Sequence, residues 1–372
     1  MLGDAEKAAV AEVLESPMLV HGPRADTFEA DFADYIGGGH AVTVANCTAA
    51  LHLAYFQLGL GAGDEVIVPA QTHAATAHAV EFTGARPVFV DAEPDTGNID
   101  IELIEDAIGP NTRALSVVHY LGMPVDMERI MALAHEYDLF VVEDAALAIG
   151  TRLDGVHAGL LGDCGTFSFY PVKHMTTAEG GMFVSRHSAV AEKAKRQKAF
   201  GLDRTVAERT MPGIYDVTML GFNYRMNEIQ AAIGIEQLKR VDGFLAQRQT
   251  NFAALSAALA DIDGVRMLTS SNGRFESSHY CLAIVLTGAL AGKRPEIVAQ
   301  LKAAGVGSSV YYPGPVPALS YYRNKYGLDP EDFPVATTLS KQSIALPVGP
   351  HLEPDDMHII AETLKKAIRN VR

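Results

Sequence analysis

A single lysine, Lys173, lies in a tight polar connection between two apolar runs of the sequence. The aromatic run 166–170 precedes it and the run 182–184 follows it, and both have the composition of buried strands. Burying an ammonium group costs several kcal/mol unless its charge is paired or its pKa falls. A neutral, desolvated lysine is the nucleophile that Schiff-base chemistry with an aldehyde or ketone needs. This stretch alone nevertheless favours a loop lysine whose ammonium group lies in water.

A second candidate group, Asp144, ends an unbroken apolar run. Residues 139–142 read Leu-Phe-Val-Val, and Glu143 and Asp144 follow them. The pattern predicts a parallel strand buried on both faces, with an acid at its carboxyl end, where open α/β sheets bind ligands. Pyridoxal phosphate needs a lysine for its aldehyde and a carboxylate for its pyridine nitrogen. A helix-capping acid is an equal alternative for Asp144 alone, but together with Lys173 the cofactor interpretation is favoured.

The composition is that of an ordinary globular protein, since 48% of the 372 residues are hydrophobic and 20% are charged. A net charge of −15 argues against nucleic acid or an anionic membrane surface as a partner. The sequence shows no signal peptide and no apolar run near the ~20 residues that a membrane helix needs. Cys47, Cys164 and Cys281 are far apart, and no cysteine or histidine cluster has metal-ligand spacing. We therefore expect a cytoplasmic protein with reduced thiols and no metal site.

Strand patterns alternate with helix patterns over the larger part of the chain. Strands are predicted at 40–44, 65–69, 87–90, 114–118 and 139–142, and helices at 4–15, 24–36, 49–58, 74–82, 101–108, 127–137, 187–201 and 226–241. This alternation predicts a parallel sheet with right-handed crossovers. His119 follows a strand at the same sheet edge as Asp144, and a structural role is favoured there over substrate contact. The polar, irregular segment 202–217 is typical of a mobile loop.

The regular alternation of predicted strands and helices ends after residue 242. A long helix is predicted at 243–260, then strands at 265–268 and 280–286 and helices at 294–304 and 354–369. We therefore expect two domains, a large one of residues 1–242 and a smaller C-terminal α+β domain of residues 243–372.

Several motifs carry a resemblance to one protein family. The lysine stretch reads FSFYPVKHMTTAEGG at 167–181. The others are ANCTAALHLA at 45–54, GLGAGDEVIVPAQTHAATAHAVEFTGARPVFVD at 59–91, VVHYLGMPVDM at 117–127, VVEDAALAIG at 141–150 and LGFNYRMNEIQAAIGIEQL at 220–238. In this order they resemble the DegT/DnrJ/EryC1/StrS family of sugar aminotransferases. The resemblance implies a fold-type I, aspartate aminotransferase-like enzyme with a mostly parallel seven-stranded sheet between helices.

The resemblance also implies a set of cofactor-binding residues. They are Thr48, Ala49, His73, Asp144, Ser168 and Lys173, with Asn223 supplied by the neighbouring subunit of a homodimer. Thr48, Ala49, Ser168 and Asn223 would hold the cofactor phosphate, and His73 would stack on the ring where relatives have an aromatic residue. The residues alone leave plainer roles open: a helix N-cap by Asn46 or Thr48, a strand hydroxyl for Ser168, a turn residue for Asn223 and an ordinary histidine for His73.

The implied reaction is a ping-pong transamination. Lys173 holds pyridoxal 5′-phosphate as an internal aldimine, L-glutamate donates the amino group, and pyridoxamine 5′-phosphate (PMP) is the intermediate. A keto group of a nucleotide-linked sugar accepts the nitrogen, in the biosynthesis of amino sugars for polysaccharides such as lipopolysaccharide O-antigen, or for antibiotics. His174 and Tyr312 are the expected substrate contacts.

Two positions depart from the family pattern. Leu147 stands where many members have glutamine, and leucine cannot donate a hydrogen bond to the phenolic oxygen of the cofactor. His174 stands where aminotransferases of the family have asparagine, and it resembles the sequence context of the related sugar 3-dehydratases. Dehydration of a nucleotide sugar, amination of a cyclitol and a catalytically silent cofactor-binding regulator therefore stay as alternatives. Retention of both Lys173 and Asp144 argues against the silent regulator.

Overall fold

The molecule is built around a seven-stranded sheet. The computed structural model describes residues 2–204, 211 and 213–372. The strands are, in order across the sheet, β1 (His40–Val44), β9 (Gly181–Ser185), β8 (Cys164–Ser168), β5 (Phe140–Asp144), β4 (Thr112–Val118), β2 (Glu65–Pro69) and β3 (Arg86–Val90). Only β9 runs antiparallel to its neighbours, and the remaining pairs are parallel. The predicted mostly parallel seven-stranded sheet is confirmed.

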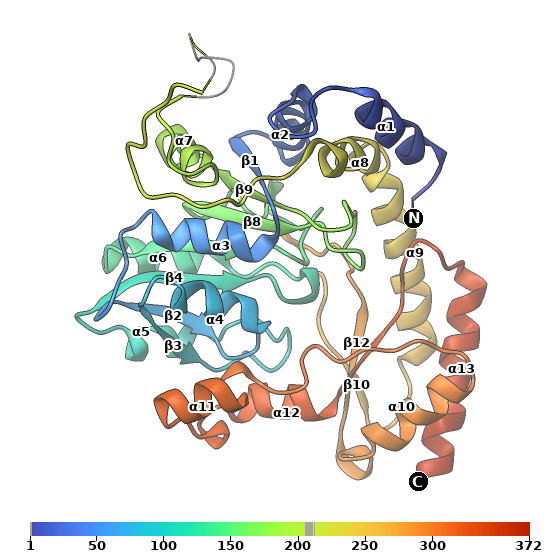
Figure 1. The fold of residues 1–372 in the computed structure, drawn as a ribbon. Helices are drawn as coiled ribbons and strands as arrows, with labels where there is room; N and C mark the ends of the chain where they lie inside the picture. Colours follow the sequence, from blue (N-terminus) through green and yellow to red (C-terminus); the bar gives the residue numbers. More distant parts are fainter. Residues whose placement is uncertain (1, 205–210, 212) are drawn as a thin grey trace.

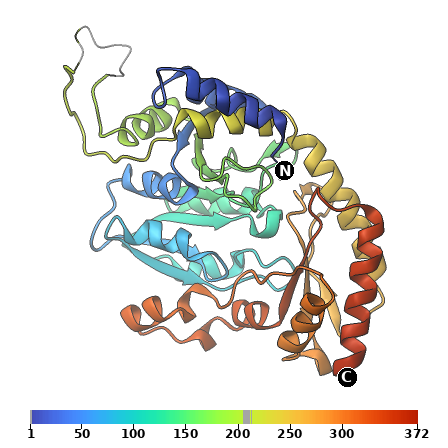
Figure 2. The same ribbon diagram turned by 45° about the vertical axis from the view of Figure 1, so that its right-hand side comes forward.

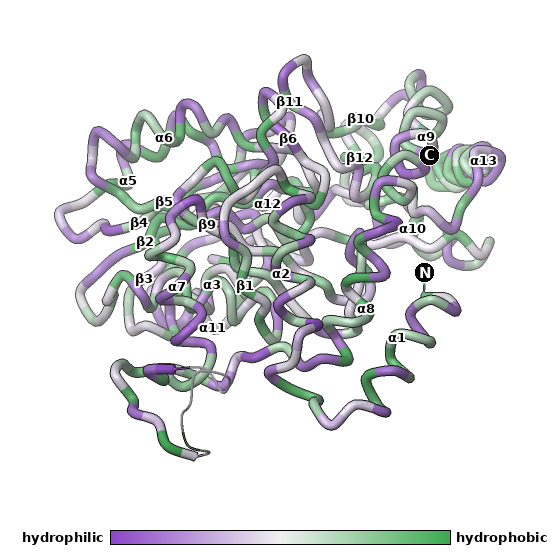
Figure 3. The backbone as a smooth tube through the Cα atoms, turned by 90° about the horizontal axis from the view of Figure 1, so that it is seen from above, coloured by the Kyte–Doolittle hydropathy of each residue, from purple (hydrophilic) through white to green (hydrophobic). Residues whose placement is uncertain are grey.

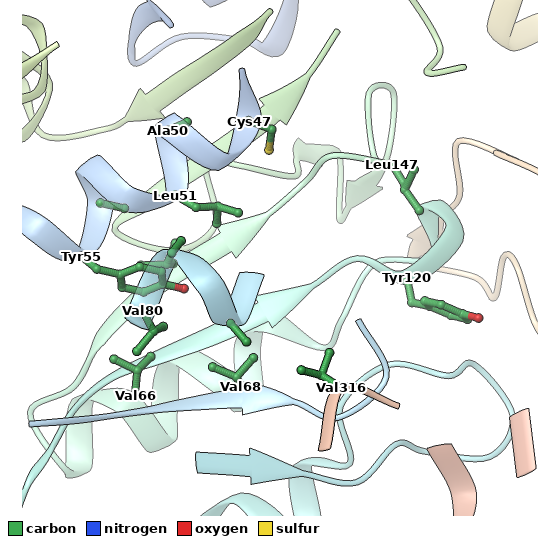
Figure 4. Packing of buried hydrophobic residues seen from close by; sticks show 14 of the residues in the cluster. Cys47, Ala50, Leu51, Tyr55, Val66, Val68, Val80, Tyr120, Leu147 and Val316 are labelled. Carbon is green, nitrogen blue, oxygen red and sulfur yellow. The ribbon is translucent and has the colours of Figure 1, made fainter. Parts of the chain in front are cut away.

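Helices cover both faces of this sheet (Figure 1). One face carries α3 (Cys47–Phe56) and α4 (Ala74–Glu81), and the other carries α5 (Ile104–Ala107) and α6 (Met127–Glu136). The alternation of side chains along a strand explains the two layers. In β2, Val66 and Val68 pack with the cluster of α3 and α4, as Figure 4 shows, whereas Ile67 between them packs with the cluster of α6.

The surface helices alternate between hydrophilic and hydrophobic residues along the chain, as α6 shows in Figure 3. Met127, Ile130 and Ala134 of α6 are buried, and their spacing of three and four residues places them on one face of a helix. This period is why the sequence pattern located α6 to within one residue.

The N-terminal helices α1 (Asp4–Glu15) and α2 (Pro23–Ile36) pack against α8 (Glu228–Leu238), as Figure 1 shows. A Cβ atom at Gly234 of α8 would lie 2.6 Å from the ring of Phe28 in α2. The glycine therefore permits the close approach of the two helices.

Two predicted helices end too late. Helix α7 (Ser188–Gln197) stops before residue 201 because the Gln197 and Lys198 carbonyls accept hydrogen bonds from the backbone of Phe222 and Tyr224. The predicted helix 226–241 is α8, which ends at Leu238, and the predicted helix 243–260 is α9 (Val241–Leu259), which begins after a turn at 239–240. In both places long-range pairing or a change of direction overrides helix propensity. The predicted loop 202–217 lies partly outside the described residues.

A second sheet lies beside the first and is antiparallel (Figure 2). Its strands are β10 (Val265–Met267), β12 (Leu282–Leu286) and β13 (Ser343–Leu346), and its helices are α9, α10 (Arg294–Ala303) and α13 (Pro354–Val371). In β12, Leu282, Ile284 and Leu286 face these helices, whereas Ala283 and Val285 belong to the core cluster shared with the first sheet. Since the second sheet is buried on both faces, the proposed boundary at residues 242/243 stays a prediction.

Several elements were not predicted from the sequence. They are β13, the short strands β6 (Arg152–Leu153), β7 (Val156–His157) and β11 (Phe275–Glu276), and the helices α11 (Ser320–Tyr326) and α12 (Pro334–Gln342). Within the described ranges, no helix combines the length and the apolar character needed to cross a bilayer. The same residues contain no cluster of three histidine, cysteine, aspartate or glutamate side chains able to hold a metal ion.

A buried carboxylate, Glu143, ties the strand β5 to its surroundings. It accepts four hydrogen bonds, from Nε2 of His119 at 2.8 Å and from the backbone N–H groups of Gly159, Leu161 and Gly162 at 2.8, 2.8 and 2.6 Å. Nδ1 of His119 accepts the backbone N–H of Val125 at 3.1 Å, which leaves the ring proton on Nε2. His119 is fully buried and thus has the structural role favoured for it.

We expect replacement of Glu143 with alanine to lower the free energy of unfolding by more than about 3 kcal/mol, because several buried donors lose their partner at once. Urea unfolding followed by circular dichroism measures this loss. Glu102→Ala is the control: Glu102 pairs with Arg129 at an exposed site, where an ion pair contributes about 0–1 kcal/mol. Equal stability losses for the two variants would contradict the assigned role of Glu143.

Candidate active site

Asp144 lies at the carboxyl end of β5 and is 5% exposed. Its Oδ2 accepts a hydrogen bond from the hydroxyl of Thr76 at 2.8 Å, and its Oδ1 accepts the backbone N–H of Ala146 at 3.1 Å. The hydroxyl of Thr76 lies 2.8 Å from that of Thr72 one turn earlier. No helix begins after Asp144, so the helix-capping alternative is excluded. Two donors from different elements fix the orientation of this carboxylate.

Lys173 lies in the turn that follows β8. The turn is closed by backbone hydrogen bonds from Lys173 N–H to the Tyr170 carbonyl and from Phe169 N–H to the Gly180 carbonyl, at 2.9 and 3.0 Å. Burial lowers the pKa of Lys173, and the nearby acidic groups of Cys47 and Asp144 partly oppose this shift. The structure therefore places Lys173 within electrostatic range of Asp144, with a pKa moved toward that of a neutral nucleophile.

The start of α3 lies against the start of β9. Asn46 is the N-cap of α3, because its side chain accepts the backbone N–H of Ala49 at 2.8 Å. A Cβ atom at Gly181 would lie 2.5 Å from the Asn46 carbonyl carbon, so only glycine fits there. Ser168 pairs directly with Gly181 across the strands β8 and β9. Through Gly181, the end of β8 at Ser168 thus adjoins the start of α3 that contains Thr48, an arrangement that suits an anion-binding turn.

This phosphate-binding candidate is connected to Asp144 through β8. Thr166 pairs with Asp144 in the sheet, and its hydroxyl lies 3.7 Å from Sγ of Cys47 at the start of α3. Figure 4 shows the sulfur of Cys47 pointing from that helix start toward the sheet. One edge of the sheet therefore carries the helix start, the carboxylate and, after β8, the lysine turn.

His73 and Tyr312 come from distant parts of the chain and lie together, with ring centroids 5.6 Å apart. Nδ1 of His73 accepts the backbone N–H of Ala75 at 3.1 Å, which makes His73 the N-cap of α4. Desolvation lowers the pKa of His73, which favours the neutral form of its flat ring. The stacking role of His73 and the substrate contact of Tyr312 stay predictions.

The segment that carries Tyr312 is fastened by its neighbour Tyr311. The carbonyl of Tyr311 accepts hydrogen bonds from Nε2 of Gln71, at 2.9 Å, and from the hydroxyl of Tyr120. The hydroxyl of Tyr311 lies 3.0 Å from that of Tyr280. The C-terminal part of the chain is thus held onto the site by polar groups of the first sheet.

His174 does not have the position expected of a substrate contact. It is 3% exposed, its Nε2 lies 3.3 Å from the Ser278 carbonyl, and its ring centroid lies 5.5 Å from that of Tyr280. Burial, together with the nearby charge of Arg248, lowers the pKa of His174 far below its usual value. This neutral, buried ring supports Tyr280, and the structure gives no support to direct substrate contact.

Leu147 is 3% exposed and belongs to the main core cluster. Figure 4 shows it in the turn after β5, at the same end of the sheet as Tyr120. Its backbone carbonyl accepts the hydroxyl of Ser278 at 3.0 Å. The leucine therefore packs the turn instead of donating a hydrogen bond.

Asn223 is exposed, and its side-chain oxygen accepts Nε of Arg225 at 3.0 Å. Its backbone forms an isolated bridge with Ala199 beyond the end of α7. The contribution of Asn223 to a neighbouring subunit stays a prediction.

Sequence reasoning missed three side chains that the fold brings to this site. Thr76 supports Asp144, Tyr280 lies with its ring centroid 5.8 Å from Nζ of Lys173, and Arg248 of α9 donates to the Tyr280 carbonyl at 2.7 Å. The sequence could have indicated Thr76. Thr72 and Thr76 are four residues apart, at the point where a predicted helix follows the carboxyl end of a predicted strand. No local signal pointed to Tyr280 or Arg248.

The residues present fit pyridoxal phosphate. A partly buried lysine with a lowered pKa suits the aldehyde, and a buried, oriented carboxylate suits the pyridine nitrogen. The start of α3 lies so close to Gly181 of β9 that a Cβ atom would not fit there. Its backbone N–H groups suit the phosphate.

We expect Thr76→Val to slow amino transfer about tenfold with little change in shape, because a charge-assisted hydrogen bond contributes about 1.5–3 kcal/mol. The half-reaction with an amino acid donor, followed as a function of pH, measures the effect. The matched control is Thr83→Val, which removes a hydroxyl that donates to the Val80 carbonyl instead. An unchanged rate and pH profile for Thr76→Val would show that Asp144 needs no such support.

Comparisons with known proteins agree with this geometry. A sequence model of the DegT/DnrJ/EryC1/StrS aminotransferase family matches residues 1–365. The chain is similar to GDP-perosamine synthase of Caulobacter vibrioides, with 39% identity over 289 residues that cover 77% of this chain and 76% of that protein.

Solved structures extend the likeness to the whole fold. DesV of S. venezuelae superposes with a TM-score of 0.89 at 33% identity and covers 97% of this chain and 93% of its own. Spr1654 of Streptococcus pneumoniae, a candidate sugar aminotransferase solved in its PMP form, superposes with a TM-score of 0.94 at 28% identity, over 100% of this chain and 98% of that one. The predicted fold class, enzyme class and cofactor are confirmed by these findings. The chain belongs to the DegT/DnrJ/EryC1/StrS aminotransferase family, a family of pyridoxal-phosphate enzymes.

Proposed function

We propose that the protein moves an amino group from L-glutamate to a keto group of a nucleotide-linked sugar. The observation that carries the proposal is the pair of Lys173, with its pKa lowered by burial, and Asp144, held by two donors at the sheet edge. The acceptor class is supported by the relative named GDP-perosamine synthase. The corresponding pathway is the biosynthesis of amino sugars for polysaccharides or antibiotics.

Pyridoxal phosphate, when bound, supplies an aldehyde that captures amines and a ring that withdraws electrons. Lys173 is the nucleophile that holds the aldehyde, and the same amine, once released, moves a proton at the donor Cα as general base and acid. Asp144 would keep a proton on the pyridine nitrogen, and Thr76 orients Asp144. Ser168, Thr48 and Ala49 would hold the phosphate, and His73 would stack on the ring.

The first experiment tests the donor half-reaction. The visible absorbance of the purified holoprotein is recorded before and after addition of L-glutamate. We expect L-glutamate to bleach the visible band while 2-oxoglutarate appears in equal amount. A band that no amino acid bleaches would refute amino transfer and favour the silent regulator.

The second experiment identifies the acceptor. The amino-loaded protein is mixed with nucleotide-linked 4-keto-6-deoxyhexoses and, separately, with keto-cyclitols, and the products are analysed by mass spectrometry. An aminated sugar nucleotide supports the proposal, and an aminated cyclitol would replace it. Loss of water from the sugar without gain of nitrogen would establish the dehydratase alternative, which the buried position of His174 does not favour.

We further propose that the active form is a homodimer with shared sites. Exposed apolar side chains gather in segments 18–20 and 214–220, among them Val20, Ile214 and Leu220, as expected of an interface. The Lys173→Ala and Asn223→Ala variants, each inactive alone, should regain part of the activity when mixed, because a hybrid dimer contains one intact site. A cytoplasmic location of this dimer stays a prediction.

A further inference from the structure

A cavity of about 280 Å³ opens beside the lysine turn, between that turn and the second sheet. Its lining includes Val172, Arg248, Tyr280, Ser308, Ser309 and His351. No aspartate or glutamate belongs to that lining. The cavity therefore combines a cation and hydroxyl donors with no negative charge of its own.

Arg248 is an unusual cation because it is 7% exposed and its charge is not neutralised nearby. Its Nη1 donates to the Tyr280 carbonyl at 2.7 Å, while its Nε has no hydrogen-bond partner. Within residues 2–204, 211 and 213–372, no carboxylate forms an ion pair with it. A buried charge without a counter-ion is costly, and an anion bound in the cavity would remove that cost.

The cavity adjoins the reacting lysine. Nζ of Lys173 and the guanidinium carbon of Arg248 each lie 5.8 Å from the ring centroid of Tyr280. Val172, the residue before the lysine, lines the cavity itself. A molecule whose amino group reacts at Lys173 can therefore extend past the Tyr280 ring toward Arg248.

We propose that this cavity binds the side-chain carboxylate of the amino-acid donor, with Arg248 as its counter-ion. The α-carboxylate is one bond from the carbon that carries the amino group, so it stays near Lys173, whereas the distal carboxylate lies several bonds further on and extends past the Tyr280 ring toward Arg248. A guanidinium matches a carboxylate in shape and charge, and Ser308 and Ser309 supply further donors. Val172, Leu346 and Val348 form an apolar wall for the methylene groups. The inference rests on the proposed amino transfer and explains a preference for a dicarboxylic donor.

The test first measures binding without chemistry. Glutarate, a dicarboxylate that lacks an amino group, is titrated into the holoprotein by calorimetry. We expect Arg248→Gln to weaken glutarate binding tenfold or more and Arg248→Lys to recover part of it. The matched control is Arg294→Gln: Arg294 also donates to backbone carbonyls, of Ser340 and Ser343, but does not line the cavity. Failure of the wild-type holoprotein to bind glutarate, or equal binding by both glutamine variants, would overturn the proposal.

A kinetic comparison then separates this pocket from the proposed reaction. We expect kcat/KM for L-glutamate to fall tenfold or more in Arg248→Gln, while kcat/KM for its neutral isostere L-glutamine changes less than threefold. Equal losses for both donors, or a loss confined to the KM of the sugar nucleotide, would overturn the carboxylate assignment. If neither amino acid reacts with the wild type, the proposed function is wrong. The glutarate titration then still tests whether the cavity binds a carboxylate through Arg248.

Discussion

Replacement of Lys173 with alanine is expected to abolish the donor half-reaction, with a rate at least about 10²–10⁴-fold below that of the wild type. General acid–base catalysis by one side chain contributes about this factor, and in the proposed reaction Lys173 would in addition be the nucleophile that holds the aldehyde. The visible absorbance change on addition of L-glutamate, followed by stopped-flow spectroscopy, measures the rate. A small external amine such as methylamine should restore part of it, since it can replace the missing base.

The control for this variant is Lys193→Ala. Lys193 donates to the Gln57 carbonyl at 2.6 Å on the far side of α3, and its loss should leave the half-reaction within about twofold of the wild type, as expected of a substitution away from the site. Circular dichroism should show both variants folded. A Lys173→Ala protein that turns over L-glutamate at the wild-type rate would refute the assignment of Lys173 as nucleophile and base.

Asp144→Asn is expected to slow amino transfer about 10²–10³-fold, the loss typical of removing one electrostatic group that stabilises developing charge. The substitution keeps the size of the side chain and can still accept one hydrogen bond, from Thr76 or from the Ala146 N–H. It removes the negative charge that keeps the pyridine nitrogen protonated. Single-turnover kinetics with L-glutamate measures the effect, and fluorescence titration of the apoprotein measures the affinity for the cofactor.

A matched variant tests whether an aspartate-to-asparagine change is by itself harmful where the carboxylate has only a structural role. Asp126 caps α6 by accepting the Arg129 N–H at 3.4 Å, and asparagine caps a helix about as well as aspartate does. Asp126→Asn should therefore leave rate and stability nearly unchanged. The same mild outcome for Asp144→Asn would mean that the charge of Asp144 takes no part in the reaction.

Most strands and helices of the first sheet could be predicted from local sequence patterns. Apolar runs marked β2, β4 and β5, and periods of three and four residues marked α2 and α6, because strand and helix periodicities are properties of neighbouring residues. The ends of α7 and α8 were not readable. The last carbonyls of α7 accept hydrogen bonds from Phe222 and Tyr224, and α8 ends in a turn at 239–240 directly before α9. β13, α11 and α12 were missed because their short runs have no period long enough to recognise.

The chemistry of the site divides in the same way. The sequence alone singled out Lys173 and Asp144 as candidates, because a lone lysine between buried strands and an acid at a strand end together suggest a cofactor site, although neither residue does so by itself. The tertiary structure decided which groups surround them. In the structure Thr76 donates a hydrogen bond to Asp144, and His174 is buried against the ring of Tyr280. Arg248 lines a cavity and has an Nε without a hydrogen-bond partner. Burial and pairing are set by contacts across hundreds of residues, and no local pattern encodes them.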